Sequence, residues 1–205
     1  MGNEANCAAS LGKQKARGKA LLETAELIFR GEDGGLRLTI PFASVKSARA
    51  VNGELRLEVP EGLAVFVLGA NAEKWCEKIL HPKTRLEKLG VKANETVCLL
   101  GKFDDDFLAE LGACTKNVSL GKIAGAPDWI FLAAESAKEL SQVAKLAKSL
   151  KDRAALWIVY PKGQKQITEN EVIGAGRKAG LKDVKVVGFS PTHTALKFVV
   201  PLLQR

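Results

Sequence analysis

The sequence predicts two domains of different fold class. Residues 20–82 are expected to form a small α+β domain, in which five short antiparallel strands are closed by a C-terminal helix. Residues 83–205 are expected to form a three-layer α/β domain with a mostly parallel sheet that ends in an antiparallel hairpin. Short alternating runs between turn residues predict the first domain, and longer apolar runs between capped helical segments predict the second. A chain of 205 residues is long enough to bury two such cores.

Turn chemistry and alternation define the strands of the first domain. Asn52 and Gly53 predict a two-residue hairpin, because both positions tolerate the positive φ of a type I′ turn. After this turn, Leu55, Leu57 and Val59 alternate with charged residues, so one face of that strand is expected to be buried. The five expected strands are residues 20–29, 36–40, 45–51, 54–59 and 63–68.

A helix is expected to close the first domain. Ala72, Trp75, Cys76 and Ile79 recur at helical spacing within residues 71–80, and Pro82 ends the pattern. We expect Trp75 to fill the open end of the curved sheet. Residues 1–19 are expected to be a flexible basic tail, with cations at Lys13, Lys15, Arg17 and Lys19.

Capping boxes define the helices of the second domain. In each, a hydroxyl residue is followed three positions later by a glutamate that satisfies its amide: Thr84 with Glu87, Ser136 with Glu139, and Thr168 with Glu171. Strands are expected at residues 96–100, 117–120, 128–134, 155–160, 184–189 and 195–200. The last two must pair antiparallel, because residues 190–194 are too few for a parallel crossover.

The basic residues are unevenly distributed. The 31 Lys and Arg residues exceed the 23 Asp and Glu residues by eight, and residues 1–82, with 11 basic and 10 acidic side chains, hold only one of these charges. Many lysines of the second part, such as Lys138, Lys145 and Lys148, lie on expected wet helix faces. A solvated surface is therefore favoured over a nucleic-acid footprint, which prefers clustered arginine and interleaved aromatic residues.

Composition excludes several classes of protein. No apolar run approaches 18 uncharged residues, so no membrane span is expected. The start of the chain has no apolar run that would act as a signal peptide, which predicts a cytoplasmic protein. The four cysteines show no CxxC spacing and are expected to be reduced, without a zinc site or a disulfide.

The candidate ligand site lies beyond the carboxyl ends of the parallel strands, where open α/β sheets bind their ligands. Gly101, Lys102 and Asp104 follow the first strand, and Glu135 follows the central strand. Tyr160 and Lys162 end the next strand, where the phenol and the ammonium are expected near the crevice. The alternative interpretation is structural: the aspartates at 104–106 cap a helix, Ser136 is an N-cap, and Lys162 lies in a solvated turn.

No motif supports catalysis or a bound cofactor. The glycine-rich run at residues 174–180 lies inside and closes a helix, whereas a dinucleotide motif follows a strand and opens one. His81 and His193 are each expected to be surface turn residues. GxSxG, HExxH and Walker sequences do not occur. The sequence therefore predicts no catalytic residue, no metal site and no cofactor.

Three segments of the second part carry a family resemblance. They are the Pro-Asp-Trp run at 127–129, the Trp-x-Val-Tyr-Pro-Lys run at 157–162 and the Leu-Lys-Phe-Val run at 196–199. Together with the stretch at 89–92 they resemble a family of uncharacterised bacterial domains. The expected strand order is similar to that of class I methyltransferases, which are Rossmann-like and bind S-adenosylmethionine. That resemblance makes residues 126–134 the fourth strand and 155–160 the fifth, but the glycine-rich loop and the ribose-binding acid of such enzymes are missing.

The first part is similar to bacterial pleckstrin-homology-like or GRAM-like domains. The resemblance rests on the Ile-Pro-Phe segment at 40–42, the Asn52 and Gly53 hairpin and the helix of Trp75. Such domains usually have seven strands, whereas five are expected here.

Three functional hypotheses follow. The first is a non-catalytic two-domain binding or regulatory protein of the bacterial cytoplasm, with an unidentified protein or small-molecule partner and a reduced methyltransferase-like domain. The alternative is an atypical S-adenosylmethionine-dependent methyltransferase that uses the crevice. Nucleic-acid binding through residues 83–205 is a third and less favoured hypothesis.

Overall fold

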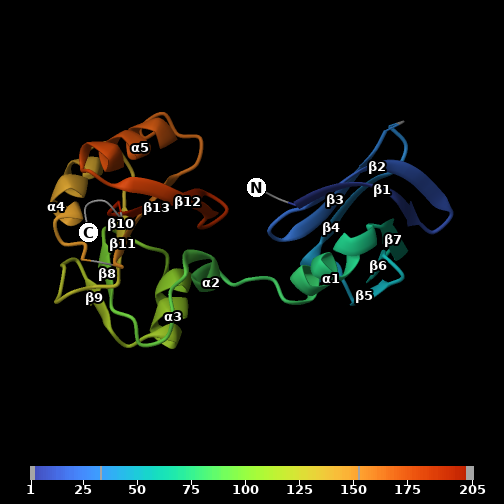
Figure 1. Cartoon of the computed structure of the whole chain (residues 1–205), viewed down its shortest axis with the longest axis horizontal. Coiled ribbons are helices and arrows are strands. Elements are labelled where there is room, and N and C mark those ends of the chain that lie inside the picture. The colour runs from blue at the N-terminus through green and yellow to red at the C-terminus, as the bar shows by residue number, and fades with distance from the viewer. Residues whose placement is uncertain (1–2, 33, 152, 202–205) are drawn as a thin grey trace. The chain divides into compact units, whose positions relative to one another are not determined.

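The computed structural model describes residues 3–32, 34–151 and 153–201 of the chain (Figure 1). The chain divides into two compact units, Met1–Lys83 and Thr84–Arg205. Among the described residues, no helix has the length and apolar character that crossing a bilayer requires.

The first unit is a curled antiparallel sheet followed by one α-helix (Figure 1). Its strands lie in the order β4-β3-β2-β1-β7-β6-β5, and every neighbouring pair is antiparallel. The strands are β1 (Asn3–Leu11), β2 (Gln14–Leu22), β3 (Glu26–Gly31), β4 (Arg37–Pro41), β5 (Ser47–Val51), β6 (Glu54–Val59) and β7 (Gly62–Val67). Short 3-10 turns, η1 (Phe42–Ser44) and η2 (Gly69–Asn71), follow β4 and β7, and the helix is α1 (Ala72–Leu80).

Two expectations for this unit are wrong. The described part of the expected tail, residues 3–19, belongs to β1 and β2, which pair along their full lengths across the turn at Gly12 and Lys13. The single strand expected at residues 20–29 is the end of β2, a turn, and most of β3. The described residues of this unit therefore form seven strands instead of five, which is the number that the pleckstrin-homology-like resemblance implies.

The hairpin and the core of the first unit agree with the sequence pattern. Asn52 and Gly53 both have positive φ, 50° and 76°, and they join β5 to β6 as predicted. Leu55, Leu57 and Val59 are buried on the inner face of β6. The four helix residues expected to face the sheet, Ala72, Trp75, Cys76 and Ile79, are all buried in the same core.

The second unit is built on a six-stranded mixed sheet in the order β12-β13-β11-β10-β8-β9. The strands β8, β10, β11 and β9 are parallel neighbours, and β13 runs antiparallel between β11 and β12. This arrangement confirms the predicted antiparallel hairpin, and the sheet is Rossmann-like, as the resemblance to class I methyltransferases implies. The strands are β8 (Val97–Leu100), β9 (Val118–Leu120), β10 (Trp129–Ala133), β11 (Ala155–Pro161), β12 (Lys182–Gly188) and β13 (His193–Val199).

Helices cover both faces of this sheet (Figure 1). One face packs against the 3-10 turn η3 (Glu139–Gln142) and the helices α4 (Val143–Ala147) and α5 (Glu169–Lys178). The other packs against α2 (Arg85–Leu89) and α3 (Asp105–Cys114). The strands β8, β10 and β11 are buried at every position, because both of their faces are covered.

Two of the three predicted capping boxes are confirmed. Thr84 and Thr168 each accept a bond from the amide three residues on, and the matching glutamate accepts a bond from their own amide. The third box is incomplete: Ser136 donates its amide and hydroxyl to Glu139, and a 3-10 turn followed by a short helix replaces the single helix expected there. Ser136 is therefore not the helix N-cap that the sequence predicts.

The glycine-rich run closes α5 as expected. A Cβ on Gly176 would clash with the ring of Phe198, which is fully buried on β13, so this glycine lets the helix approach the sheet. Gly180 has a positive φ of 77° just beyond the helix.

Candidate functional site

A cleft of about 1050 Å³ opens at the carboxyl ends of β8 and β10, on the face of the sheet that α2 and α3 cover. Strand β9 lies on one side of β8 and β11 on the other side of β10, so the cleft lies where the order of the parallel strands reverses direction. Its apolar lining includes Phe103, Ala133, Val159 and Phe189, all buried. Lys102 and Asp104 from the loop after β8, and Glu135 after β10, line the same cleft.

Gly101 has a packing role at the edge of this cleft. Its φ is +93°, and a Cβ there would lie 2.8 Å from the carbonyl oxygen of Ala133. The turn after β8 therefore closes onto the end of β10, and glycine is needed because any side chain would meet that backbone.

A histidine–carboxylate pair stands in the cleft. Nε2 of His193, at the start of β13, lies 3.3 Å from Oε1 of Glu135, which is 58 positions earlier in the chain. The His193 side chain is 28% exposed and that of Glu135 is 66% exposed, so both groups are accessible to a ligand. His193 was expected to be a surface turn residue; it lies where the turn after β12 enters β13, and its contact with Glu135 was not expected.

The turn between β12 and β13 holds the other ring nitrogen of His193. Nδ1 lies 2.9 Å from the hydroxyl oxygen of Thr192 and 3.5 Å from that of Ser190. The Ser190 hydroxyl also accepts bonds from the amides of Thr192 and His193, at 3.3 and 3.0 Å. Ser190 therefore stabilises the turn, and the turn fixes the orientation of the imidazole.

A hollow of about 680 Å³ adjoins the cleft. The cleft and this hollow share Glu135, Pro191, Thr192 and His193, so the histidine–carboxylate pair forms part of the wall of each. Lys162 lines this hollow, and its Nζ donates to the carbonyl oxygens of Ser190 and Pro191 at 2.7 and 3.3 Å. This lysine ties the end of β11 to the turn that carries the histidine.

Arg85 of α2 lies in the wall of the cleft, and all three of its guanidinium nitrogens bond to carboxylates. Its Nε and Nη2 donate to the carboxylate of Glu110 at 3.0 Å each, and Nη1 donates to both oxygens of Asp104 at 3.1 Å. The guanidinium also lies 5.1 and 5.0 Å from the ring centroids of Phe107 and Phe189. Burial alone would lower the pKa of Arg85, but the two carboxylates outweigh burial and raise it.

Replacing Arg85 with lysine is expected to lower the free energy of unfolding by about 1–2 kcal/mol. An ammonium cannot reproduce the two-pronged bond to Glu110 or the planar contact with both rings, and partial exposure of the carboxylates limits the loss. Urea unfolding measures the change. Arg177→Lys is the matched control, because Arg177 is 68% exposed and makes a single long contact of 3.5 Å with Asp183. Equal effects of the two substitutions would contradict a structural role for the Arg85 cluster.

Tyr160 does not lie in the cleft, contrary to expectation. Successive residues of β11 face opposite sides of the sheet: Val159 faces the cleft, whereas Tyr160 packs in the core under α4 and α5. Its hydroxyl donates to Oε2 of Glu169 at 3.2 Å. Burial first, and the negative charge of Glu169 second, raise the pKa of Tyr160 above its ordinary value of 10.0.

This placement predicts the alkaline titration of the chain. Tyr160 is the single tyrosine, so the near-ultraviolet absorbance of phenolate reports this group alone. A raised folded pKa means that its contribution to stability is complete below pH 10 and is lost as the pH rises toward the folded value. We expect a native titration midpoint above 10 that falls toward 10 in denaturant. An unchanged midpoint in denaturant would show that the phenol is solvated in the folded chain.

The structure brings most of the predicted site residues together and adds others. The cleft is lined by Lys102, Asp104 and Glu135, and the adjoining hollow is lined by Lys162. Asp104 also caps α3, because its carboxylate accepts a 2.7 Å bond from the amide of Phe107. Sequence patterns did not indicate His193, Arg85 or the segment from Gly188 to Thr192 as parts of the site. The signal that could have found this part of the site is the presence of a histidine in the turn between the last two strands.

The described residues do not fit the usual cradle of an adenosyl cofactor. Gly101 is packed against Ala133, which leaves no open glycine-rich turn after β8. Strand β9 ends at Leu120 and is followed by Gly121 and Lys122, so no carboxylate stands where a ribose would be held. No group of three His, Cys, Asp or Glu side chains within the described ranges is arranged to hold a metal ion.

Comparisons with known proteins give remote likenesses. No protein-family model and no curated protein matches the chain, so the resemblance to uncharacterised bacterial domains has no support from a family model. An O-methyltransferase from Thermotoga maritima matches at 9% identity and a TM-score of 0.42, covering 87% of this chain and 94% of that one. A methyltransferase from Aquifex aeolicus matches at 18% identity and 0.41, covering 55% and 86%. The DH/PH domains of p115-RhoGEF match at 14% and 0.31, covering 39% and 29%. No activity is transferred from these likenesses.

Proposed function

We propose that the second unit is a small-molecule-binding domain. Its ligand would have an apolar or aromatic body that lies on Phe103 and Phe189, and a hydroxyl or amino group that bonds to the Glu135–His193 pair. The pair carries this proposal, because elements 58 positions apart place a carboxylate and an imidazole against each other at the carboxyl edge of the sheet. Clefts that combine apolar walls with a few converging polar groups are the usual form of small-molecule sites.

The charges of the cleft define the class of ligand further. Arg85 is neutralised by Asp104 and Glu110, so it offers no free charge to an anion. Lys88 and Lys102 line the cleft together with Glu135 and Asp106, so its remaining cations and carboxylates are equal in number. Such a balanced lining favours a polar ligand with little net charge over a polyphosphate.

Native mass spectrometry tests the proposal. We expect the purified chain to carry a small molecule, seen as an excess of native over denatured mass, and the double variant Glu135→Ala with His193→Ala to lack it. Glu169→Ala is the control, because this glutamate lies at the other face of the sheet and bonds Tyr160. The proposal is wrong if the wild-type chain shows no excess mass, or if the cleft variant keeps it.

A second candidate function is methyl transfer from S-adenosylmethionine. The strand order of the sheet, with β13 inserted antiparallel beside β11, favours this candidate. The packed turn at Gly101 and the missing carboxylate after β9 weigh against it. Titration calorimetry with S-adenosylmethionine separates the two: heat that disappears in Glu135→Ala supports the second candidate, and a flat titration of the wild-type chain removes it.

We further propose that the first unit is a pleckstrin-homology-like binding module that works in a reducing compartment such as the cytoplasm. Seven antiparallel strands followed by one helix support the module. The cysteines are all free thiols, and burial raises the pKa of Cys7 to about 11, which suits a structural role.

A further inference from the structure

The outer face of strands β2, β3 and β4 in the first unit is strongly cationic. Period-two alternation turns the small and apolar residues of β2 inward and Lys15, Arg17 and Lys19 outward. Arg30 on β3 and Arg37 on β4 are exposed on the same outer face. Five cations thus share one surface, which we call the β2–β4 face.

The strand register places like charges directly opposite each other. Lys19 of β2 is paired with Arg30 of β3, and Arg30 is paired with Arg37 of β4. Like charges at opposed cross-strand positions destabilise a sheet. These opposed like charges lower the stability of the sheet, and a partner that supplies negative charge would relieve their repulsion.

Neighbouring carboxylates neutralise only part of this charge. Glu4 bonds Lys19 at 2.7 Å, Glu26 begins β3, and Glu32 directly follows it. Within residues 3–32, 34–151 and 153–201, no ion pair joins a carboxylate to Lys15, Arg17, Arg30 or Arg37. These four side chains are therefore available to an external anion.

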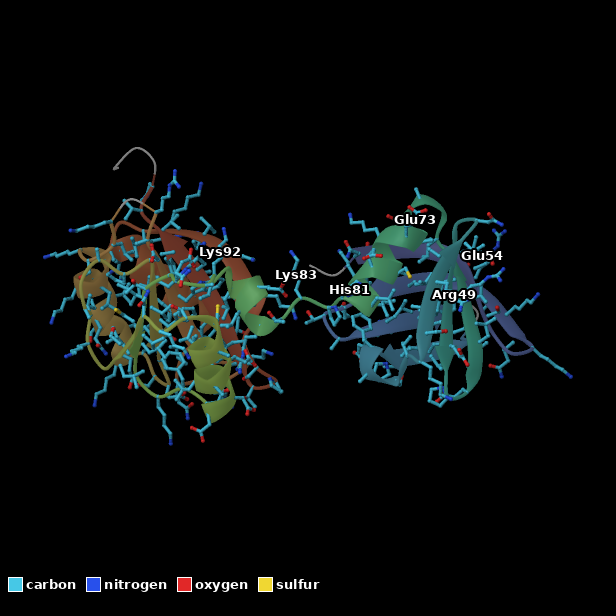
Figure 2. All side chains as sticks on the ribbon, turned by 90° about the horizontal axis from the view of Figure 1, so that it is seen from below. Arg49, Glu54, Glu73, His81, Lys83 and Lys92 are labelled. Atoms are coloured by element: carbon cyan, nitrogen blue, oxygen red, sulfur yellow. The ribbon has the colours of Figure 1, made fainter. Side chains whose placement is uncertain are left out.

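Arginine makes up a larger share of the basic residues on this face than in the whole chain. The chain has nine arginines among its 31 basic residues, and three of them lie here, although the sequence as a whole prefers lysine. Arginine is the better residue for phosphate, because its planar donors match two oxygens at once. The other outward arginines of the sheet, Arg49 on β5 and Arg56 on β6, are also opposed to each other, but Arg56 is paired with Glu54 at 2.8 Å. Figure 2 labels Arg49 and Glu54 on these two strands.

We propose that the β2–β4 face binds the phosphate backbone of double-stranded nucleic acid without reading its sequence. The face has no exposed aromatic side chain among its described residues on which single-stranded bases could stack. The exposed large apolar residues of the first unit, Val51, Leu63, Val67 and Leu80, lie on other elements, and the outward Leu21 and Ile28 of this face are only partly exposed. The face therefore presents no fully exposed large apolar side chain for insertion into a membrane. The partner that complements this row of cations is therefore a regular row of phosphates.

Fluorescence anisotropy of the full chain with a labelled duplex of arbitrary sequence tests this assignment. We expect binding that weakens steeply with salt, and a triple variant, Arg17→Gln, Arg30→Gln and Arg37→Gln, that binds roughly tenfold more weakly at low salt. For this variant, the slope of log affinity against log salt concentration is expected to be less negative by about 3, since each lost phosphate contact removes about one unit. These side chains are exposed, so circular dichroism should show an unchanged fold.

A charge-matched control separates this face from general basicity. Lys138→Gln, Lys145→Gln and Lys148→Gln remove the same charge from exposed positions of the second unit, and we expect them to leave affinity nearly unchanged. Equal losses in the two triple variants would overturn the proposal in favour of a diffuse basic surface. Binding to vesicles that contain phosphatidylserine but not to the duplex, lost with the same three arginines, would overturn it in favour of a membrane. The absence of duplex binding at low salt would also overturn it.

Discussion

Trp75→Ala is expected to lower the free energy of unfolding of the first unit by about 3–5 kcal/mol. The indole is 1% exposed and packs with the inner residues of the curled sheet, and α1 contacts β5 and β6. Its removal leaves a cavity that the paired strands cannot collapse to fill. Amide hydrogen exchange, read by mass spectrometry on peptides from β5, β6 and β7, should show a loss of protection of that size.

Leu80→Ala is the matched control for this substitution. It lies on the same helix and is 46% exposed, so the expected cost is less than about 1 kcal/mol. Peptides from β8, β10 and β11 give an internal reference in the same experiment. Unchanged protection of β5, β6 and β7 in Trp75→Ala would show that the helix is not part of the core of the first unit.

Gly101→Ala is expected to lower the free energy of unfolding of the second unit by about 2–4 kcal/mol. Two costs add: a left-handed φ of +93° for a residue with a side chain, and a Cβ placed 2.8 Å from the carbonyl oxygen of Ala133. Urea unfolding measures the loss. The result decides between two roles for this glycine, since a glycine kept for ligand approach would lose binding and keep stability.

Gly163→Ala isolates the backbone part of that cost. Gly163 has a φ of +65° with no heavy atom within 4 Å of a built Cβ, so only the conformational cost, about 1–2 kcal/mol, is expected. A Gly101→Ala variant no less stable than Gly163→Ala would refute the packing role that the contact with Ala133 assigns to Gly101.

Local chemistry made much of the fold predictable. The caps at Thr84 and Thr168 and the turn at Asn52 and Gly53 depend on residues within four positions of each other. The buried strands β10 and β11 were predictable because a short apolar run bounded by turn residues is typical of a strand that is covered on both faces. The antiparallel setting of β13 followed from the length of its connection alone.

Strand β1 and most of β2 were missed for a compositional reason. Their inward positions hold small residues, among them Ala5, Cys7, Ala9 and Ala16, and Gly18 of β2 lies opposite Gly31 of β3. Alanine and glycine give little contrast with the polar positions between them, so the alternation is present but weak. The outward lysines and arginines then resemble a solvated tail.

The candidate site was predictable only in part. Glu135 was found because it follows a buried strand and caps nothing. Tyr160 was assigned to the wrong face of its strand. A strand buried on both faces has no alternation of polar and apolar residues to show which side chains face the cleft. His193 reaches Glu135 only because β13 inserts beside β11, which brings the β12–β13 turn next to the end of β10.

The insertion of β13 also constrains the order in which the second sheet can be completed. Strand β12 joins the sheet only through β13, and β13 is the neighbour of β11 on that side. Until residues 193–199 are in place, β11 therefore presents an unpaired edge, and such edges pair readily with other chains. Strand β13 thus protects the second unit against edge-to-edge aggregation during folding.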